Sequence, residues 1–351
     1  MKKKRIIFTV INDLTYDQRM IRICTSLVKA NYEVLLVGRN LKSSKPLTAQ
    51  PFQQLRLNCF FEKGKFFYLE YNLRLFFFLF WKKFDAVCAI DLDTILPAFY
   101  ISHWKNKPLI YDAHEYFTEV PEVVRRPRVQ RIWEWVAQKT IPKCTHCYTV
   151  CKSLADIFHE KYNTRFEVIR NCPVGNQGLT SSQVLNFEDS EKEEIESLTE
   201  SQSSNTPKII FYQGALNEGR GLEQMIQAMQ YIDGVKFQLA GEGDLSDDLR
   251  KLVRDLKLEK KVEFLGYQMP EDLRQLTPNA WLGINLLENN GKSYFYSLAN
   301  KTFDYVQAGV PALHMAFPEY KNLNQEFEVS ILVENLIPQD LTKIVNELLE
   351  S

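Results

Sequence analysis

The sequence predicts an α/β protein built from two Rossmann-like, doubly wound parallel-sheet domains that face a cleft. Short β-branched runs alternate with helix-like segments from the start, stop in one polar stretch, and then resume. The chain has 351 residues, which is more than a single hydrophobic core usually serves. Strands separated by amphipathic helices pair in parallel and are covered by helices on both faces.

The polar stretch predicts the domain boundaries. It is rich in Gly, Ser, Gln and Asn around an acidic run, which is typical of a solvated tether. We therefore expect an acceptor-side domain over residues 1–175, a linker over 176–207, and a second domain over 208–351. The expected strands are 5–11, 33–37, 55–60, 86–90, 109–112, 147–150 and 166–169, then 208–212, 235–240, 262–265, 281–285 and 312–314. Ligands of such sheets bind at the carboxyl ends of the strands.

Composition excludes several classes. With 45% hydrophobic residues, 25% charged residues and a net charge of -1, the chain is an ordinary globular protein with no global field for nucleic acid. The apolar run after Lys2–Arg5 stops at Asn12 without a cleavage site, so it predicts a strand instead of a signal peptide. The seven cysteines are scattered, which indicates a reducing cytoplasm. Their spacing lacks a closed zinc pattern, so no metal site is expected.

Residues 66–84 form a strongly apolar segment that is too short to span a bilayer. We expect a helix buried in the layers of the first domain, because a helix that is apolar all round has two layers to fill. The other interpretation is an interfacial anchor with one face in a membrane surface.

Residues 297–311 predict an anion-binding helix start. Ser297 is the expected N-cap, which leaves the N–H groups of Leu298, Ala299 and Asn300 facing a phosphate with the helix dipole behind them. Lys301 adds a positive charge.

Asp304 completes this pattern. It lies three residues after Lys301 and four after Asn300, so the three side chains share one helical face, and its carboxylate can accept hydrogen bonds from sugar hydroxyls. An ordinary capped helix before a buried strand explains the same residues.

A glycine loop opens the second half, between a strand and a helix. Gly214, Gly219 and Gly221 let the backbone approach a phosphate, and Arg220 offers a fork of donors for two phosphate oxygens. A second loop begins at Gly241, which we also place on the donor side. Its spacing differs from the dinucleotide fingerprint, which disfavours a dehydrogenase.

In the first half, His114 follows a strand and is expected at the carboxyl edge of the sheet, next to Glu115. The loop after the first strand ends at the same edge. We expect it to receive an acceptor through Asn12, Asp13 and Arg19, with Glu115 nearby.

Three segments together resemble the family 4 glycosyltransferases of the two-domain GT-B architecture, namely 111–115, 212–222 and 300–311. The resemblance covers nearly the whole chain in the right order. It implies transfer from a nucleoside-diphosphate sugar with retention of configuration, without a cofactor or an obligatory metal.

The resemblance also implies roles for individual residues. His114 would contact the donor sugar, Arg220 would hold the diphosphate, and Asp304 would bind ribose hydroxyls. Tyr267 lies in the stretch that lines the nucleobase pocket. Two positions depart from the family pattern: Ala215 stands where a basic residue is usual, and the first acidic residue of the spaced pair falls near Tyr296.

The expected function is therefore a cytoplasmic sugar transferase with a glycan or lipid-linked acceptor. A further expectation is peripheral contact with the inner membrane face. The membrane part rests on a basic and aromatic cluster, which also fits a solvated helix face: Arg125, Arg126, Arg128, Arg131, Trp133 and Trp135. A nucleotide-sugar epimerase and an inactive transferase-like partner are the alternatives.

Overall fold

The computed structural model describes residues 3–15, 17–173 and 207–351, and divides into two compact units. The first unit is Met1–Asn171 with Gly291–Ser297, and the second is Cys172–Asn290 with Leu298–Ser351. The expected linker over 176–207 lies outside the described residues apart from Pro207. Gly291–Ser297 clusters with the first unit, although the sequence places it well inside the second half.

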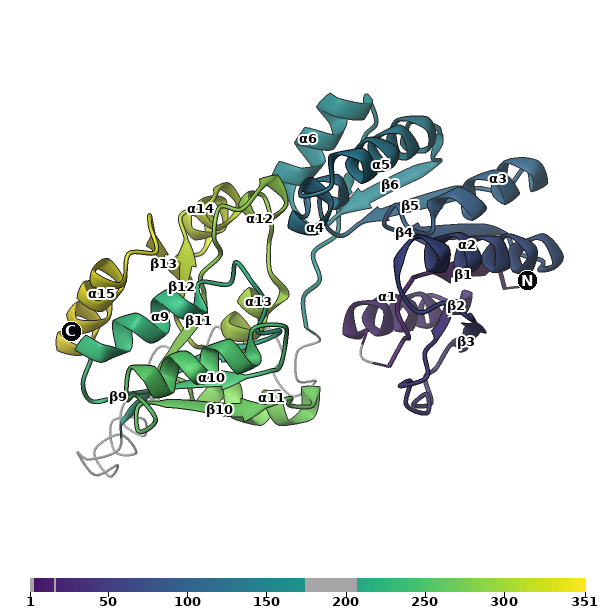
Figure 1. The fold of residues 1–351 in the computed structure, drawn as a ribbon. Coiled ribbons are helices and arrows are strands. Elements are labelled where there is room, and N and C mark those ends of the chain that lie inside the picture. Colours follow the sequence, from purple (N-terminus) through teal and green to yellow (C-terminus); the bar gives the residue numbers. More distant parts are fainter. Residues whose placement is uncertain (1–2, 16, 174–206) are drawn as a thin grey trace, which may run out of the picture. The chain divides into compact units, whose positions relative to one another are not determined.

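The first unit contains a seven-stranded parallel sheet with the order β3-β2-β1-β4-β5-β6-β7 (Figure 1). Its strands are β1 (Arg5–Thr9), β2 (Glu33–Asn40), β3 (Gln53–Asn58), β4 (Ala86–Ile90), β5 (Leu109–Ala113), β6 (His146–Thr149) and β7 (Glu167–Val168). Its helices are α1 (Gln18–Lys29), α2 (Gly64–Trp81), α3 (Ile95–Lys105), α4 (Pro121–Val124), α5 (Pro127–Thr140), α6 (Lys152–Tyr162) and α12 (Lys292–Phe295), with 3-10 turns η1 (Phe117–Glu119) and η2 (Ile141–Lys143). The chain reverses direction across the sheet between β1 and β4, where ligands of such folds bind.

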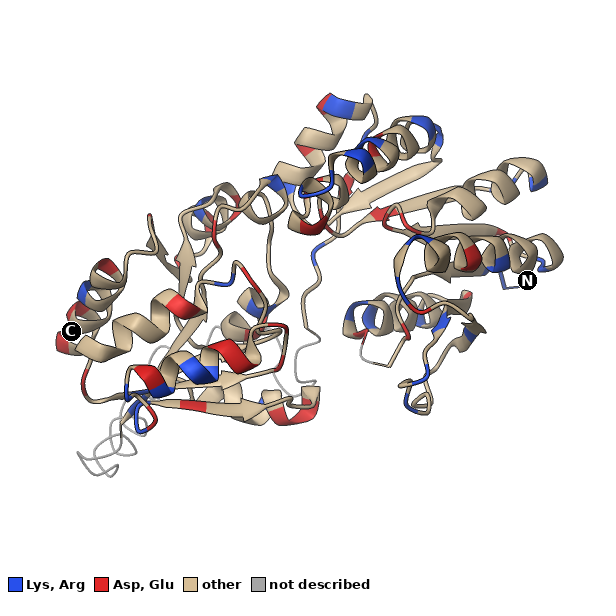
Figure 2. Ribbon diagram, in the orientation of Figure 1, with Lys and Arg blue, Asp and Glu red and all other residues tan. Residues whose placement is uncertain are grey.

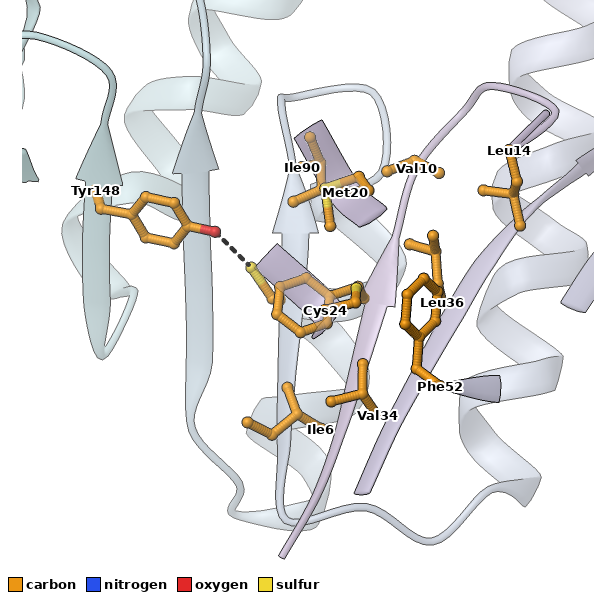
Figure 3. Close-up of a cluster of buried hydrophobic side chains, with 12 residues drawn as sticks. Ile6, Val10, Leu14, Met20, Cys24, Val34, Leu36, Phe52, Ile90 and Tyr148 are labelled. Carbon is orange, nitrogen blue, oxygen red and sulfur yellow. Dashed lines mark hydrogen bonds between the residues drawn. The ribbon is translucent and has the colours of Figure 1, made fainter. Parts of the chain in front are cut away.

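Strand alternation sends the side chains of β1 to opposite faces of the sheet. Ile6 and Phe8 join the core that α1 covers with Met20 and Cys24 (Figure 3). Thr9 points the other way and its Oγ1 donates to Thr94 Oγ1 at 3.0 Å, just before α3. The sheet is therefore covered on both faces, as the sequence predicts.

The second unit has a six-stranded parallel sheet with the order β10-β9-β8-β11-β12-β13. Its strands are β8 (Lys208–Gln213), β9 (Val235–Ala240), β10 (Val262–Gly266), β11 (Leu282–Asn285), β12 (Ala312–Met315) and β13 (Ser330–Val333). Its helices are α9 (Leu222–Ala228), α10 (Ser246–Asp255), α11 (Pro270–Leu276), α13 (Asn300–Gln307), α14 (Pro318–Glu326) and α15 (Pro338–Glu350), with 3-10 turns η3 (Met229–Tyr231) and η4 (Thr277–Asn279). The sequence did not predict β13, because a four-residue edge strand carries little periodic signal.

Helix α2 corrects one expectation. Its inner side is buried through Phe67, Tyr71, Leu75 and Leu79, but its outer side is exposed. The predicted burial of the whole helix is therefore wrong, because only one side of α2 meets the unit's core. In the described part of the chain, no helix combines the length and hydropathy needed to cross a membrane.

Candidate active site

The residues of the second unit that the sequence predicts to bind an anion gather at the carboxyl end of β8. Lys301 Nζ lies 3.8 Å from the centroid of the Tyr212 ring. A Cβ atom added to Gly214 would lie 3.3 Å from the same Nζ. The charges of Arg220 and Asp304 both act on Lys301. The structure thus brings together residues from the glycine loop and from α13 that are far apart in the sequence.

Two positive charges act on each other in this cluster. The pKa of Lys301 falls well below its usual value because the ammonium group is desolvated and because Arg220 repels it; Asp304 opposes these effects only in part. Like charges held together in a desolvated place favour an anionic ligand, which relieves their repulsion. A diphosphate has the negative charge for this role.

Asp304 is held by a buried chain of polar side chains. Gln213 Nε2 donates to Asp304 Oδ2 at 2.8 Å, and Thr277 Oγ1 donates to Gln213 Oε1 at 2.7 Å. Gln213 ends β8 and is 5% exposed. The sequence analysis missed this residue, although its place at a strand end is the signal that could have found it.

The start of α13 differs from the expectation. The helix begins at Asn300 with Ala299 as its N-cap, and no side chain caps it. Ser297 belongs to the first unit, and its Oγ donates to Tyr294 O at 2.8 Å. The predicted Ser297 cap is therefore wrong, because this serine closes the turn after α12 instead.

The N–H groups before α13 are also less open to a phosphate than expected. Ala299 N donates to the Tyr320 hydroxyl at 3.1 Å, and Asn285 Nδ2 donates to the same oxygen at 2.8 Å. Leu298 is 6% exposed. Tyr320 from α14 thus fixes the helix start, and the N–H groups left for the expected phosphate are those in the first turn of α13, from Asn300 onward.

Glycines shape the loops around Lys301. Gly241 has φ +154, and a Cβ atom there would lie 1.9 Å from the carbonyl oxygen of Gly214. The loop after β9 thus supports the loop after β8 at a distance that only glycine allows. Gly219 has φ +78, and its carbonyl accepts from Glu288 N at 3.0 Å. Tyr267 lies half-exposed after β10.

In the first unit, His114 follows β5 and is paired with a carboxylate that the sequence analysis missed. His114 Nδ1 contacts Asp91 Oδ2, and His114 N donates to Asp91 Oδ1 at 3.3 Å. Asp91 comes directly after β4, is buried, and has φ +53. The side chain of His114 remains 42% exposed. Asp91 thus holds the Nδ1 side of the imidazole, while part of the ring remains accessible to solvent.

The charge of Asp91 sets the protonation of His114. Desolvation alone lowers the pKa of the imidazole, but the charge and hydrogen bond of Asp91, with a smaller effect of Glu115, raise the pKa to about 10. His114 is therefore an imidazolium at neutral pH, and both ring nitrogens are donors. Asp93, two residues along, is buried, and its pKa is well above the usual value because of desolvation and the charge of Asp91.

Asp91→Asn is expected to lower the pKa of His114 from about 10 toward the ordinary histidine value of about 6.5. Asparagine keeps the shape and tolerates the left-handed backbone of Asp91, so the loop should persist. The pKa can be measured from the ring proton shifts of His114 in an NMR titration. Glu115→Gln is the matched control and should move it less; equal shifts in the two variants would contradict the assignment.

The residues expected on the acceptor side mostly hold their own loop. Asn12 Nδ2 donates to Asp17 Oδ2 at 2.6 Å, and Asp17 Oδ1 caps α1 by accepting from Met20 N. Asp13 accepts from Thr15 Oγ1 at 3.0 Å. These contacts fix the turn between β1 and α1.

Arg19 is placed differently from the expectation of an acceptor contact. Its guanidinium forms a two-pronged ion pair with Asp112 of β5, and the two side chains are 10% and 0% exposed. We assign Arg19 to the stability of the first unit, because its charge is balanced in the interior. Glu115 stays beside His114.

One group in the described residues has the geometry of metal ligands. The ligand atoms of Asp91, His114 and Glu115 lie within 4.8 Å of one another. Asp91 already holds His114 Nδ1, so a cation would have to replace that contact.

Comparisons with known proteins match both halves of the chain to glycosyltransferases. The family model "Glycosyltransferase Family 4" matches residues 18–172, and "Glycosyl transferases group 1" matches residues 194–351. An uncharacterized glycosyltransferase of Methanocaldococcus jannaschii is 36% identical over 76 residues, which span 21% of this chain and only 20% of that protein.

Two solved structures share the fold over nearly the whole chain. Sucrose-phosphate synthase from Thermosynechococcus elongatus has a TM-score of 0.75 at 13% identity, and Anabaena HepE, crystallised with UDP-glucose, has a TM-score of 0.71 at 16% identity. In both cases the match covers 99% of this chain and 90% of the other. From the two family matches and this fold, the chain belongs to the family 4-like glycosyltransferases of the GT-B architecture.

Proposed function

We propose that this glycosyltransferase moves a sugar from a nucleoside-diphosphate sugar to a glycan or lipid-linked acceptor, with retention of configuration and without an obligatory metal. The observation that carries the proposal is that Lys301 lies beside Gly214 in the second unit, where the charge of Arg220 also acts on it. These two cations and the first turn of α13 offer positive charge to a diphosphate. The UDP-glucose bound to HepE is consistent with this donor class.

The chemistry follows from the leaving group. As the bond to the sugar breaks, negative charge builds on the departing phosphate oxygen. Lys301 and Arg220 are already in place to stabilise it, so little reorganisation is needed at that moment. In this proposal two fixed cations perform the task that a divalent metal performs in other transferases.

His114 acts on the sugar side in this proposal. Its imidazolium, held by Asp91, can donate to a hydroxyl of the donor sugar. The nearby carboxylates of Asp91 and Glu115 balance its charge. With retention, the departing phosphate oxygen can take the proton of the acceptor, so the proposal needs no separate protein base. The remaining site residues position the nucleoside: Asp304 faces the ribose and Tyr267 the base.

A thermal-shift panel of nucleoside diphosphates and their sugars identifies the donor, since a ligand stabilises the fold that binds it. Calorimetry of the best ligand then tests the site. Arg220→Ala and Asp304→Ala should each weaken binding by about 1 to 3 kcal/mol, the value of a lost charged hydrogen bond. Arg254→Ala, which removes an exposed arginine of α10, is the control. Unchanged affinity in both site variants would remove them from the donor site.

Product analysis then separates the reactions. The donor is incubated with and without acceptor oligosaccharides or lipid-linked sugars, in the presence of a chelator. Transfer that persists with the chelator supports the proposal. Isomerised donor in the absence of acceptor would instead identify an epimerase, and bound but unreacted donor would identify an inactive partner. We place the reaction in the cytoplasm, because seven scattered cysteines fit a reducing compartment.

A further inference from the structure

Helix α2 carries an apolar stripe on the side that faces away from the sheet. Its members recur every three or four residues and therefore lie along one side of the helix. They are Phe66, Leu69, Leu73, Phe77 and Trp81, and their exposed fractions range from 51% to 79%. An outer helix side of a globular unit is normally polar. This one is apolar where it meets the solvent.

Helix α3 lies beside α2, and α5 lies beside α3 (Figure 1). Exposed rings on both helices continue the apolar surface. On α3, the Trp104 ring stacks on Phe80 of α2 at a centroid distance of 4.9 Å and is 66% exposed. Lys139 of α5 then links the next two rings, with its Nζ 5.3 Å from the Tyr100 centroid and 4.8 Å from that of Trp135. We call this surface the aromatic face: Phe66, Leu69, Leu73, Phe77, Trp81, Tyr100, Trp104 and Trp135.

Basic residues surround the aromatic face. Residues 63–83 hold five basic side chains, which are Lys63, Lys65, Arg74, Lys82 and Lys83, against a single acidic one, Glu70. Glu70 is already engaged by Arg74 and by the N–H groups of Phe60 and Phe61. Helix α3 contains no acidic residue. Further basic residues lie along α5 (Figure 2). The rim of the face is therefore positively charged.

A shallow apolar cavity extends the face toward the edge of the sheet. It has a volume of about 470 Å³ and lies between β3 and the C-terminal half of α2. Its lining includes the apolar side chains of Leu57, Phe77 and Trp81. Arg74 and Lys82 also line it. Such a cavity fits part of one acyl chain of a phospholipid, while the phosphate of its headgroup remains beside the cations.

We propose that the aromatic face docks the first unit onto an anionic lipid bilayer. Aromatic rings favour the interface between headgroups and chains, and lysines near it are attracted by anionic headgroups. A bilayer satisfies both parts of the surface at once. A second copy of the chain would bring two lysine rims together, which like-charge repulsion opposes. A polyanion such as nucleic acid would leave the apolar stripe in water.

The other sides of α2 contact the loops that carry the site of the first unit. Asn72 Nδ2 donates to Asp93 O at 3.0 Å, in the loop that also holds Asp91. The Tyr71 hydroxyl donates to Val10 O at the end of β1. Docking of α2 would thus fix the site of the first unit relative to the lipid surface. The idea that docking brings a lipid-linked acceptor to this site rests on the proposed function. The docking itself does not.

Sedimentation with lipid vesicles tests the proposal on the full chain. The vesicles consist of phosphatidylcholine, either alone or with about one-third phosphatidylglycerol, which carries the negative charge. We expect the chain to bind the mixed vesicles and to bind the neutral ones far less. The triple variant Leu69→Ser, Leu73→Ser, Phe77→Ser should lose at least about a hundredfold in partition coefficient, because three apolar side chains no longer enter the interface.

A second variant tests the charge separately. Lys82→Gln with Lys83→Gln should weaken binding about fivefold per lysine on the mixed vesicles only, and added salt should remove the difference. The matched control removes three exposed apolar side chains from the second unit, through Tyr231→Ser, Phe327→Ser and Ile337→Ser. It should bind as the parent does.

The NMR titration of His114, which lies in the same unit as α2, shows that the first unit of each variant is folded. Nucleoside-diphosphate binding by each variant keeps this result separate from the donor site. The proposal is overturned if the parent chain does not sediment with the mixed vesicles, or if the control variant loses as much binding as the triple variant. It is also overturned if sedimentation velocity shows a parent dimer that the triple variant converts to monomers. If the triple variant does not fold, the lysine variant, which leaves the apolar side chains untouched, decides by the same criteria.

Discussion

Lys301→Met is expected to slow sugar transfer by about 100- to 1,000-fold, the usual effect of removing one preorganised group that stabilises charge in the transition state. Methionine keeps most of the apolar stem over the Tyr212 ring, so packing changes little. The measurement is the initial rate at saturating donor. Lys301→Arg should retain far more activity, because it keeps the positive charge.

The stability of the same variant separates a catalytic role from a structural one. The pKa of Lys301 is depressed in the folded chain, so its ammonium opposes folding at every pH below its unfolded value. Lys301→Met should therefore be as stable as the parent or more stable in thermal unfolding without ligand. A variant that is both inactive and unstable would contradict the assignment. Lys251→Met, on the exposed side of α10, is the control.

Nucleotide binding should also take up protons. A bound diphosphate raises the depressed pKa of Lys301 by placing negative charge beside it. Calorimetry of the parent in two buffers with different ionisation enthalpies measures this uptake. In Lys301→Met the uptake should shrink or vanish.

Arg19→Met is expected to destabilise the first unit by about 3 to 5 kcal/mol near neutral pH, the typical cost of removing one partner from a buried ion pair. The change leaves Asp112, which is fully buried, without its cation. Chemical denaturation of the full chain measures the loss, with the unfolding of the first unit followed by a probe placed there. Arg22→Met, on the next turn of α1, is the control, since that side chain is only part-buried and contacts Asn171.

The pH dependence of this loss has a defined sign. Burial raises the pKa of Asp112, and Arg19 counteracts this in part. Without Arg19 the folded carboxyl should hold its proton well above its unfolded pKa of about 3.9. The unfolded state then binds fewer protons, so the stability of the variant falls as pH rises from this value toward the raised folded pKa. The defect should therefore be smaller in acid.

A double variant distinguishes a stabilising pair from a merely compensated one. Arg19→Met with Asp112→Leu replaces both charges by apolar side chains of similar size. Such replacements are often neutral or better, so most of the lost stability should return. If the double variant is as unstable as Arg19→Met, the loss comes from packing and not from an uncompensated charge.

The sequence predicted the layout of the fold because that layout depends on local patterns. All twelve expected strands agree in place with the structure to within a few residues, although β7 is only two residues long. Alternating runs and glycine turns are properties of neighbouring residues, and parallel pairing follows from the intervening helices. The four-residue β13 was missed.

For the site, the sequence identified residue types and strand ends but not partners. Lys301, Asp304 and Gly214 do lie together, since each sits at a strand end or on the helix that the sequence predicted. The prediction of Ser297 as N-cap was wrong, because Ser297 belongs to the first unit and its Oγ donates to Tyr294 O instead.

The sequence by itself determined two parallel-sheet domains, a glycine loop ahead of a helix, and a family resemblance that the comparisons confirm. Only the tertiary structure decided which charge meets which: that Asp91 makes His114 a cation, that Arg19 is neutralised by Asp112, and that one side of α2 stays in solvent. The reason is physical. Periodicity and turn chemistry act over a few residues, whereas desolvation and ion pairing depend on groups that the folded chain brings together from distant positions.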